Sequence, residues 1–449
     1  MKKILVIEDD EALNEYAVRA LQNADYEVER AYNGQEGVEK ADSFKPDLVV
    51  LDLMMPGIHG IQVCEKLRSN SSLAETRILI SSAKGYASDI TGAREAGADD
   101  YLQKPYKTEE LQRKVADLLE APQTNGMIKD PAPERAQAEL PRTMIITGEA
   151  AEAATAAAMG VKKSVKVRFW GTRGSCPAPG PDTVRYGGNT SCTELRFGDI
   201  ICIIDCGSGL RELGIELMKE FSNQAIQAHV FVGHTHWDHI QGFPFFTPFY
   251  LPRNNFNLFS VRGAGKSLER VFRGQMASDY FPVPLKSLSA NINFVEMEAP
   301  IQVGPVKVSY QFLNHPGISI GFRFEAYGKS ITYISDHETF SRLNGKNDVT
   351  QKQDEMVADF AKGSDLLICE AQYDEEEYKH KKGWGHSTFR DVITRGIDAK
   401  VGHLVLFHHD PLHTDEMMDA YLDECRELVR QSDSKMILTA ARERQTLEV

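Results

Sequence analysis

The chain has 449 residues, a formal net charge of −14, 42% hydrophobic residues and 26% charged residues. These proportions are those of a globular protein, and the length predicts two or three domains rather than one core. The acidic net charge argues against extended binding of nucleic-acid backbones, although it does not exclude a local basic groove. No apolar run is long enough to predict a membrane span, and seven scattered cysteines without a CxxC pair favour reduced thiols in the cytoplasm.

Residues 1–120 alternate short apolar runs with helical patterns. The expected strands include KILVIE as the first, DLVVLDL as the third, RILISS as the fourth and DDYLQKP as the fifth, and EALNEYAVRAL has the spacing of an amphipathic helix. Nearly continuous Val, Ile and Leu are typical of parallel strands that are buried on both faces. We therefore expect an α/β domain with a doubly wound parallel sheet.

Carboxylates follow two of these expected strands. Glu8 and Asp9 come after the first strand and Asp52 after the third, at the sheet edge where ligands bind in open α/β sheets. Three carboxylates repel one another unless they hold a hard cation such as Mg²⁺. Lys104 supplies a countercharge after the fifth strand. Each residue alone could be a solvated loop residue, but their order favours a site.

This pattern resembles the receiver domain of two-component response regulators over essentially all of 1–120. The resemblance implies that Asp52 accepts a phosphoryl group from a sensor histidine kinase or a phosphotransfer protein. It further implies a Mg²⁺ site, a pair of switch residues and a lysine before Pro105 in a peptide bond that is often cis. The implied Mg²⁺ ligands are Glu8, Asp9, Asp52 and the Met54 carbonyl. The switch pair is Ser82 and Tyr101, and Lys104, the lysine before Pro105, acts with them.

Residues 121–164 are rich in alanine and proline and poor in large apolar residues. We interpret this stretch as a linker, with a small docking helix as the alternative. From residue 165 to 449 strand-like runs such as VKVRFW, HVFVGH and LLICEA return, separated by Gly/Pro loops. This part is predicted to be a second domain.

The segment HTHWDH at 234–239 crowds three histidines and an aspartate behind an apolar run. A histidine-rich surface loop would not need that buried strand. His315, Asp336 and His408 also follow strand-like runs. Five imidazoles and two carboxylates suffice for two transition ions, zinc or manganese, with iron as a further candidate. The expected first ion uses His234, His236 and His315, the second uses Asp238, His239 and His408, and Asp336 bridges them.

This ligand set resembles the metallo-β-lactamase superfamily over about 165–449, which implies an αββα sandwich of two mixed sheets. Two ions about 3.5–4 Å apart activate water and neutralise a phosphoryl oxygen. The resemblance also implies that Asp238 is among the catalytic residues. GGNTSC, IDCGSG and GHST point to the branch of ribonuclease Z and phosphoribosyl cyclic phosphodiesterase.

In that branch, His386 of GHST would protonate the leaving oxygen and Glu370 would orient it. Cys369 stands where the family has a histidine, so the finer proton relay differs here. Only 21 residues separate His315 from Asp336, which leaves no space for the basic arm of ribonuclease Z enzymes that grip transfer RNA. A small phosphodiester such as a cyclic nucleotide fits better.

Several neighbouring features have weaker support. The segment WDHIQGFPFFTPFY could stack a base or form core, Arg173 and Arg211 could meet phosphate, and 266–290 could form a lid. Asp205 is expected to orient a ligand loop. His337, His409 and His413 could support the ligands or be exposed.

The sequence thus predicts a response regulator whose output is a dinuclear metal-dependent phosphodiesterase controlled at Asp52. The alternatives are a ribonuclease Z-like RNA endonuclease, a metal-binding sensor or scaffold without turnover, and an esterase or thioesterase. We expect control through docking or homodimerisation on the fourth and fifth helical segments of the receiver.

Overall fold

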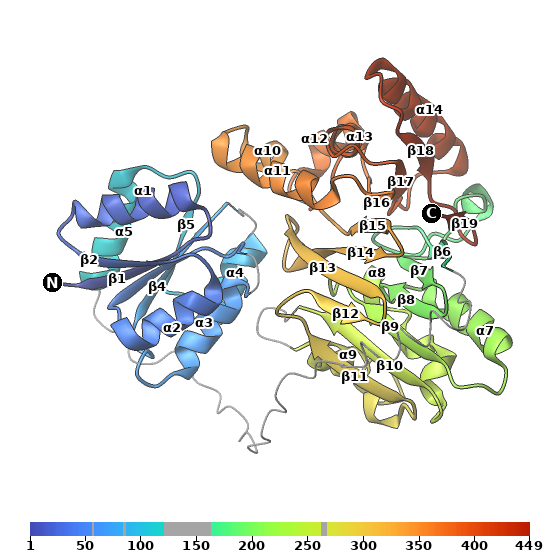
Figure 1. The fold of residues 1–449 in the computed structure, drawn as a ribbon, viewed down its shortest axis with the longest axis horizontal. Helices are drawn as coiled ribbons and strands as arrows, with labels where there is room; N and C mark the ends of the chain where they lie inside the picture. Colours follow the sequence, from blue (N-terminus) through green and yellow to red (C-terminus); the bar gives the residue numbers. More distant parts are fainter. Residues whose placement is uncertain (56–57, 84–86, 121–162, 262–266) are drawn as a thin grey trace.

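The computed structural model describes residues 1–55, 58–83, 87–120, 163–261 and 267–449, arranged as two domains side by side (Figure 1). Most of the predicted linker, 121–162, lies outside the described residues, and so does the alternative of a docking helix there. The second domain begins with a strand at Val165, as the sequence predicts.

The N-terminal domain is a five-stranded parallel sheet in the order β2-β1-β3-β4-β5 with helices on both faces, which confirms the predicted doubly wound fold. Strands β1 and β3 are buried throughout nearly all their length because helices cover both faces. The strands are β1 Lys3–Ile7, β2 Glu27–Ala31, β3 Leu48–Leu51, β4 Arg77–Ser82 and β5 Asp100–Gln103; the helices are α1 Glu11–Gln22, α2 Gly34–Phe44, α3 Gly60–Ser69, α4 Ala87–Glu95 and α5 Thr108–Glu120.

The C-terminal domain contains two seven-stranded mixed sheets, which confirms the predicted αββα sandwich. The first has the order β11-β10-β9-β8-β7-β6-β19 and the second the order β12-β13-β14-β15-β16-β17-β18. The first sheet comprises β6 Val165–Gly171, β7 Cys192–Phe197, β8 Ile200–Ile204, β9 Gln227–Phe231, β10 Asn255–Ser260, β11 Asn291–Glu296 and β19 Thr446–Glu448; the second comprises β12 Ile301–Val303, β13 Val306–Leu313, β14 Ser319–Ala326, β15 Lys329–Ile334, β16 Leu366–Glu370, β17 His403–Phe407 and β18 Ile437–Ala440.

Aromatic side chains fill the space between the two sheets. The ring centroid of Phe231 lies 5.0 Å from that of Phe324 and 5.5 Å from that of Phe322, and Phe197 stacks on Phe324 at 6.2 Å. Large rings at these distances remove much apolar surface from water and hold the sheets face to face. The sandwich therefore gives the loops at the strand ends a rigid base.

Helices cover the outer faces (Figure 1). Leu213 and Leu217 of α7 and Phe272 of α9 pack in one apolar cluster against strands of the first sheet, whereas Val392 of α13 and Met418 of α14 pack with the second. The helices are α7 Leu210–Phe221, α8 Trp237–Ile240, α9 Leu268–Gln275, α10 Phe340–Asn344, α11 Asp348–Ala361, α12 Glu375–Lys381, α13 Phe389–Asp398 and α14 Asp415–Gln431, with 3-10 turns η1 Pro181–Thr183, η2 Phe243–Phe245, η3 Thr247–Tyr250 and η4 Leu285–Ser287.

Candidate metal centres

The acidic pocket of the N-terminal domain lies at the carboxyl ends of β1 and β3. Glu8, Asp9 and Asp52 place one carboxylate oxygen each within 4.8 Å of one another. Lys104, after β5, reaches into the same pocket, and its Nζ lies 2.5 Å from Glu8 Oε2 and 2.9 Å from Asp52 Oδ2. The structure thus brings together the oxygen ligands and the countercharge that the sequence predicts at this edge.

Burial and mutual repulsion change the acidity of this pocket. Burial raises the pKa of Glu8 to about 8, against the attraction of Lys104. Burial and the neighbouring Asp52 carboxylate raise the pKa of Asp9 to about 7. Carboxylates that are this reluctant to ionise together fit a hard divalent cation, since the cation supplies the missing positive charge. The oxygen-only ligand set fits Mg²⁺.

The predicted switch residues lie beside Asp52. Ser82 ends β4 and is buried, and the half-buried Tyr101 forms a hydrogen bond with it. The Lys104–Pro105 peptide bond is cis, as the sequence resemblance implies. Met54, whose carbonyl is the remaining predicted ligand, follows Asp52 closely, and its backbone N–H donates to Asp52 Oδ1 at 3.2 Å.

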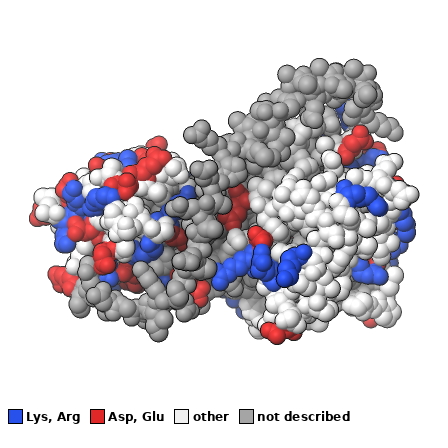
Figure 2. Space-filling model, turned by 90° about the horizontal axis from the view of Figure 1, so that it is seen from below, with Lys and Arg blue, Asp and Glu red and all other residues white. Residues whose placement is uncertain are grey.

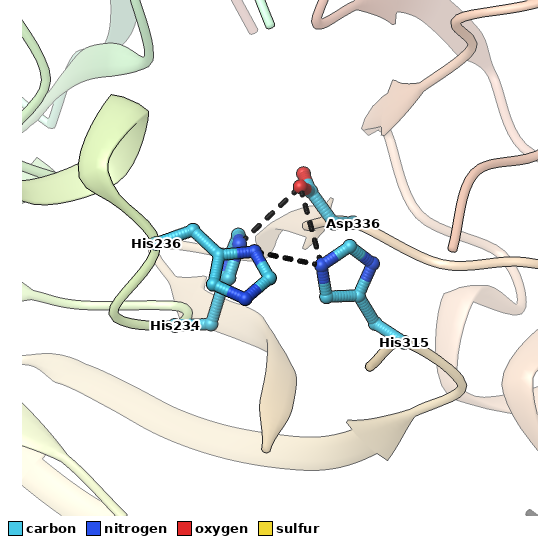
Figure 3. Close-up of side chains that lie close together, drawn as sticks. All are labelled: His234, His236, His315 and Asp336. Carbon is cyan, nitrogen blue, oxygen red and sulfur yellow. Dashed lines mark hydrogen bonds and ion pairs between the residues drawn. The ribbon is translucent and has the colours of Figure 1, made fainter. Parts of the chain in front are cut away.

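The histidine-rich segment forms the turn from β9 into the short helix α8. His234 and His236 lie on this turn, and His315 reaches the same point from the end of β13 (Figure 3). His315 Nε2 lies 3.0 Å from His236 Nδ1, and His234 Nε2 lies 3.3 Å from Asp336 Oδ2. Together with Asp336 these histidines make the first group that could hold a metal ion.

A second group shares Asp336 with the first. Asp336 Oδ1 lies 3.2 Å from His408 Nε2 and 3.4 Å from His239 Nε2, while its Oδ2 faces the first group. Asp238 Oδ2 lies 3.0 Å from His408 Nε2 and 3.3 Å from His239 Nε2. The two carboxylate oxygens of Asp336 therefore face different groups, which is the arrangement expected of a bridging ligand.

The protonation states fit metal ligation. Burial lowers the pKa of His236 to about 4 and that of His315 well below its ordinary value, so both imidazoles are neutral. Burial opposes ionisation of Asp336, but the imidazoles of His408 and His239 hold its pKa well below the usual range. His239 differs: burial lowers its pKa, but the surrounding carboxylates, Asp238 foremost, raise it above the ordinary value. Neutral histidine and ionised carboxylate are the forms that bind divalent transition ions, so His236, His315 and Asp336 fit directly, whereas His239 must give up a proton when an ion binds.

Orphaned polar atoms provide an independent test of the fit. His234 Nε2 and Asp336 Oδ1 are fully buried and make no hydrogen bond among the described residues. The Nε2 atoms of His239 and His408 face each other at 3.1 Å. Buried groups of this kind are costly unless a cation completes their environment. The mixed nitrogen and oxygen donors fit zinc, manganese or iron.

Neighbouring side chains hold the ligands in place. Asp205 accepts from His239 Nδ1 at 2.8 Å, from the Tyr333 hydroxyl at 2.7 Å and from the Gly233 N–H at 2.7 Å, in agreement with its expected orienting role. Gln372 Oε1 lies 3.1 Å from His408 Nδ1. Such contacts fix the ring orientation and leave the opposite nitrogen for the metal.

The backbone at the site is strained and closely packed. Asp205 and His408 both adopt left-handed conformations, with φ of 62° and 61°, which are uncommon for residues other than glycine. Gly385 also has positive φ and approaches His315 so closely that a Cβ would lie 2.2 Å from Nδ1. Its carbonyl accepts from that nitrogen at 2.8 Å. The strained positions thus lie where ligands are oriented.

His386 lies at the rim of the metal groups. Its Nδ1 is 3.5 Å from Glu370 Oε2 and 3.9 Å from Asp336 Oδ2. Although burial lowers it, the carboxylates of Asp336 and Glu370 raise the pKa of His386. Glu370 in turn accepts the Ser387 N–H at 2.8 Å, which fixes its position. The predicted pairing of His386 with Glu370 is therefore present in the geometry.

A cavity of about 460 Å³ opens over these groups and is lined by Ser175, Thr235, His236, Trp237, Asp238, Asp336 and His386. Trp237 is largely exposed on the ligand turn, and Trp384 is largely exposed on the loop that carries His386. The backbone N–H of Ser175 donates to Asp238 Oδ2 at 2.8 Å. This cavity is the surface that a substrate would contact.

The aromatic segment after the ligand turn divides into two classes. Phe243 and Phe246 are buried core, so the base-stacking alternative is wrong for them, whereas Trp237 and Phe245 are exposed. In the described part of the suggested lid, 267–290, Leu268 and Phe272 are anchored in the core. Most of the expected wall is therefore structural.

The two arginines suggested for phosphate binding have other partners. Arg173 is fully buried and donates to the carbonyls of Gly187, Asp410 and His413, and Arg211 pairs with Glu212 at the surface. His337, His409 and His413 are buried, so the alternative that they are exposed is wrong.

The sequence analysis did not predict the contacts of Gln372 and of the Gly385 carbonyl with ligand histidines. A single amide side chain and a backbone oxygen form no recognisable sequence motif.

Each of the two domains matches a known protein family. Residues 4–116 match the response regulator receiver domain, and residues 202–409 match the beta-lactamase superfamily domain. The response regulator ArlR of Staphylococcus aureus is 39% identical over 119 residues, which are 26% of this chain and 53% of that protein. The chain thus spans about half the length of such curated relatives.

Two solved structures are similar to the C-terminal part. The metallo-beta-lactamase fold protein YhfI from Bacillus subtilis aligns with 64% of this chain and 100% of its own, with 17% identity and a TM-score of 0.45. The short form of human tRNase Z aligns with 63% of this chain and 98% of its own, with 20% identity and a TM-score of 0.42.

Among the described residues, no helix combines the length and apolar character that crossing a membrane requires.

Proposed function

Since the chain joins a response regulator receiver domain to a metallo-β-lactamase-fold domain, we propose that it is a response regulator with a metal-dependent phosphodiesterase as its output. The observation that carries the proposal is the pair of ligand groups that share Asp336. Two divalent ions at such a site would supply Lewis-acid stabilisation of a phosphoryl oxygen and lower the pKa of water. The first ion would be held by His234, His236 and His315, and the second by Asp238, His239 and His408.

Hydrolysis adds one water across a P–O ester bond, so the water oxygen joins phosphorus and the leaving oxygen takes up a proton. His386 is the proposed donor of that proton, because it lines the cavity and carries a raised pKa. The Glu370 carboxylate, 3.5 Å from Nδ1 of His386, favours the protonated imidazole. Asp238 and Asp336 would provide negative charge to hold the cations.

A small phosphodiester such as a cyclic nucleotide is the proposed substrate. The cavity of about 460 Å³ accommodates a mononucleotide-sized molecule. Between His315 and Asp336 the chain forms only the hairpin β14–β15, without an arm that could grip a folded RNA. On the face drawn in Figure 2, the basic side chains of the C-terminal domain lie in separate groups divided by broad uncharged areas, rather than in a continuous basic strip.

The receiver half implies a partner that phosphorylates Asp52, a sensor histidine kinase or a phosphotransfer protein, and Mg²⁺ held by Glu8, Asp9 and Asp52. We further propose the domain division 1–120, 121–164 and 165–449. Homodimerisation through the receiver and a cytoplasmic location stay predictions, the latter in keeping with seven free cysteines.

A substrate screen tests the proposed function. Purified protein loaded with zinc, manganese or iron would be offered bis-p-nitrophenyl phosphate, cyclic mononucleotides and dinucleotides, an RNA hairpin and a thioester. We expect hydrolysis of the small phosphodiesters and little cleavage of the hairpin. Preferred cleavage of the hairpin would support the ribonuclease Z-like alternative, and thioester turnover alone would support the esterase. Tight metal binding with no turnover of any substrate would support a sensor or scaffold.

A further inference from the structure

The two domains touch through the edge of the receiver sheet that carries the acidic pocket. Asn344 at the end of α10 donates to the Ala83 carbonyl at 2.7 Å and accepts from Gln103 Nε2 at 3.2 Å. Lys352 of α11 pairs with Asp10. These three receiver residues are the direct chain neighbours of Ser82, Lys104 and Asp9, so the contact surrounds the phosphorylation site.

A second set of contacts anchors the receiver beside this edge. The ring centroid of His59, at the start of α3, lies 4.8 Å from that of Phe312 in β13. Lys66 Nζ lies 3.8 Å from Glu298 Oε1. Buried apolar residues of the two domains belong to one contiguous cluster. The sequence predicts the coupling surface on the fourth and fifth helical segments, whereas these contacts between the domains lie at strand ends and at α3.

Helix α10 is also attached to the loop that carries His386. Arg342 of α10 bonds Glu375 at 2.8 Å, and Glu375 accepts the Thr388 hydroxyl at 3.0 Å. Just before α10, Glu338 accepts the N–H groups of Gly383 and Gly385 at 2.9 and 3.0 Å. The same short segment, 336–344, therefore begins at Asp336, binds the His386 loop through Glu338 and Arg342, and ends at Asn344, which contacts the receiver.

We propose that the hydrolase surface formed by Asn344 and Lys352 is a docking site for the unphosphorylated receiver, and that phosphorylation of Asp52 releases it. This inference rests on the proposed function only for its effect on hydrolysis. Transfer of a phosphoryl group to Asp52 replaces the single negative charge of its carboxylate by a group that carries roughly −1.5 to −2 and three acceptor oxygens, and the donor leaves without that group. Lys104 and Ser82 are the donors beside Asp52, and their movement displaces Gln103 and Ala83.

Release acts on hydrolysis through the segment 336–344. Docking holds the end of α10, and α10 holds the loop of His386 through Arg342 and Glu338. Undocking loosens this loop and alters proton delivery to the leaving oxygen, while the metal ligands stay in place. By linkage, if phosphorylation of Asp52 weakens docking, docking disfavours phosphorylation by the same factor, so a change that weakens docking should favour phosphorylation.

The first test measures backbone amide hydrogen exchange of the full chain. The docking variant carries Asn344→Ala and Lys352→Glu, and the matched control is Lys362→Glu, whose lysine pairs only locally with Asp359 at the end of α11. We expect exchange in α10 and in residues 383–388 to become about three- to tenfold faster in the docking variant. Treatment of wild type with acetyl phosphate should have the same effect, and Asp52→Asn should not respond.

The second test follows phosphoryl loading of Asp52 from acetyl phosphate with Mg²⁺. The docking variant should be loaded to a higher steady-state fraction than wild type, with an equilibrium shifted about three- to tenfold. Lys362→Glu should match wild type. Equal exchange and equal loading in the docking variant, the control and wild type would overturn the proposal.

Hydrolysis supplies the last comparison. The unphosphorylated docking variant should hydrolyse a phosphodiester at the rate of phosphorylated wild type. A different rate, with exchange and loading changed as expected, would overturn the link from docking to the His386 loop. Because exchange and loading need no hydrolase turnover, absence of phosphodiesterase activity in every form would count against the proposed function and not against docking.

Discussion

The receiver pocket and the hydrolase centre both gather carboxylates at strand ends, but they balance the charge differently. In the receiver, Lys104 lies between Glu8 and Asp52 and neutralises part of their charge. In the hydrolase, both oxygens of Asp336 face imidazoles, and buried polar atoms lack hydrogen bonds among the described residues. The receiver pocket thus contains part of its own countercharge, whereas the buried donors of the hydrolase centre fit divalent cations.

The largest effect should come from Asp336→Ala, which removes the residue shared by both ligand groups. We expect loss of both transition ions and of phosphodiester hydrolysis to background. Phosphorylation of Asp52 should be unaffected because the receiver pocket shares no ligand with the hydrolase centre. Metal analysis and radiolabelled loading from acetyl phosphate measure the two halves separately. Retention of half the activity would show that Asp336 does not bridge.

His386→Ala should lower turnover about 10²- to 10⁴-fold on substrates with poor leaving groups, the usual scale for a general acid. The loss should shrink with p-nitrophenolate, which leaves without protonation. Metal content should be unchanged because the imidazole and carboxylate groups around Asp336 remain. Equal losses on both substrates would assign His386 a structural role.

Asp205→Asn should weaken metal binding at the second group about 10- to 100-fold, the usual cost of losing an orienting partner. Asp205 holds Nδ1 of His239, and an amide in its place cannot accept three hydrogen bonds as strongly. Competition with a chelator measures this affinity. Asp182→Asn provides the control, since that aspartate lies in the outer turn η1. Unchanged affinity in Asp205→Asn would remove the orienting role.

The smallest effect should be the change with pH in the stability of the receiver and in its affinity for Mg²⁺. Burial and Asp52 raise the folded-state pKa of Asp9 from 3.8 to about 7, so the folded metal-free state binds a proton that the unfolded chain releases. This group stabilises the metal-free fold fully below about pH 4, and its contribution is lost as pH rises through about 7. Since Glu8, with a pKa raised to about 8, must also release a proton to bind the ion, Mg²⁺ affinity should rise up to about 100-fold per pH unit below about pH 7 and about tenfold between about pH 7 and 8.

Titration of Mg²⁺ by calorimetry between about pH 5 and 8, with Asp9→Asn as the control, measures that dependence. The variant lacks one of the two titrating carboxylates, keeps Glu8, and should show a flatter profile. Equal slopes in wild type and Asp9→Asn would mean that another group controls the site.

Much of both sites could be predicted from residue type and position. Acids and histidines directly after apolar runs predicted the ligands, because strand ends of one sheet meet at one edge. Gln372 and the Gly385 carbonyl could not be predicted, since their roles arise only when distant loops meet. Asn344 gave no signal either, because a single asparagine at a helix end is an ordinary feature of sequences. Domain contacts depend on three-dimensional placement that periodicity does not encode.

The metal content of the folded protein tests the central claim most directly. Elemental analysis of wild type, Asp52→Asn and Asp336→Ala, all purified without chelator, counts the transition ions per chain. We predict two ions in wild type and in Asp52→Asn, and loss of both in Asp336→Ala. One ion or none in folded wild type, or a change in transition-ion content in Asp52→Asn, would contradict two independent centres.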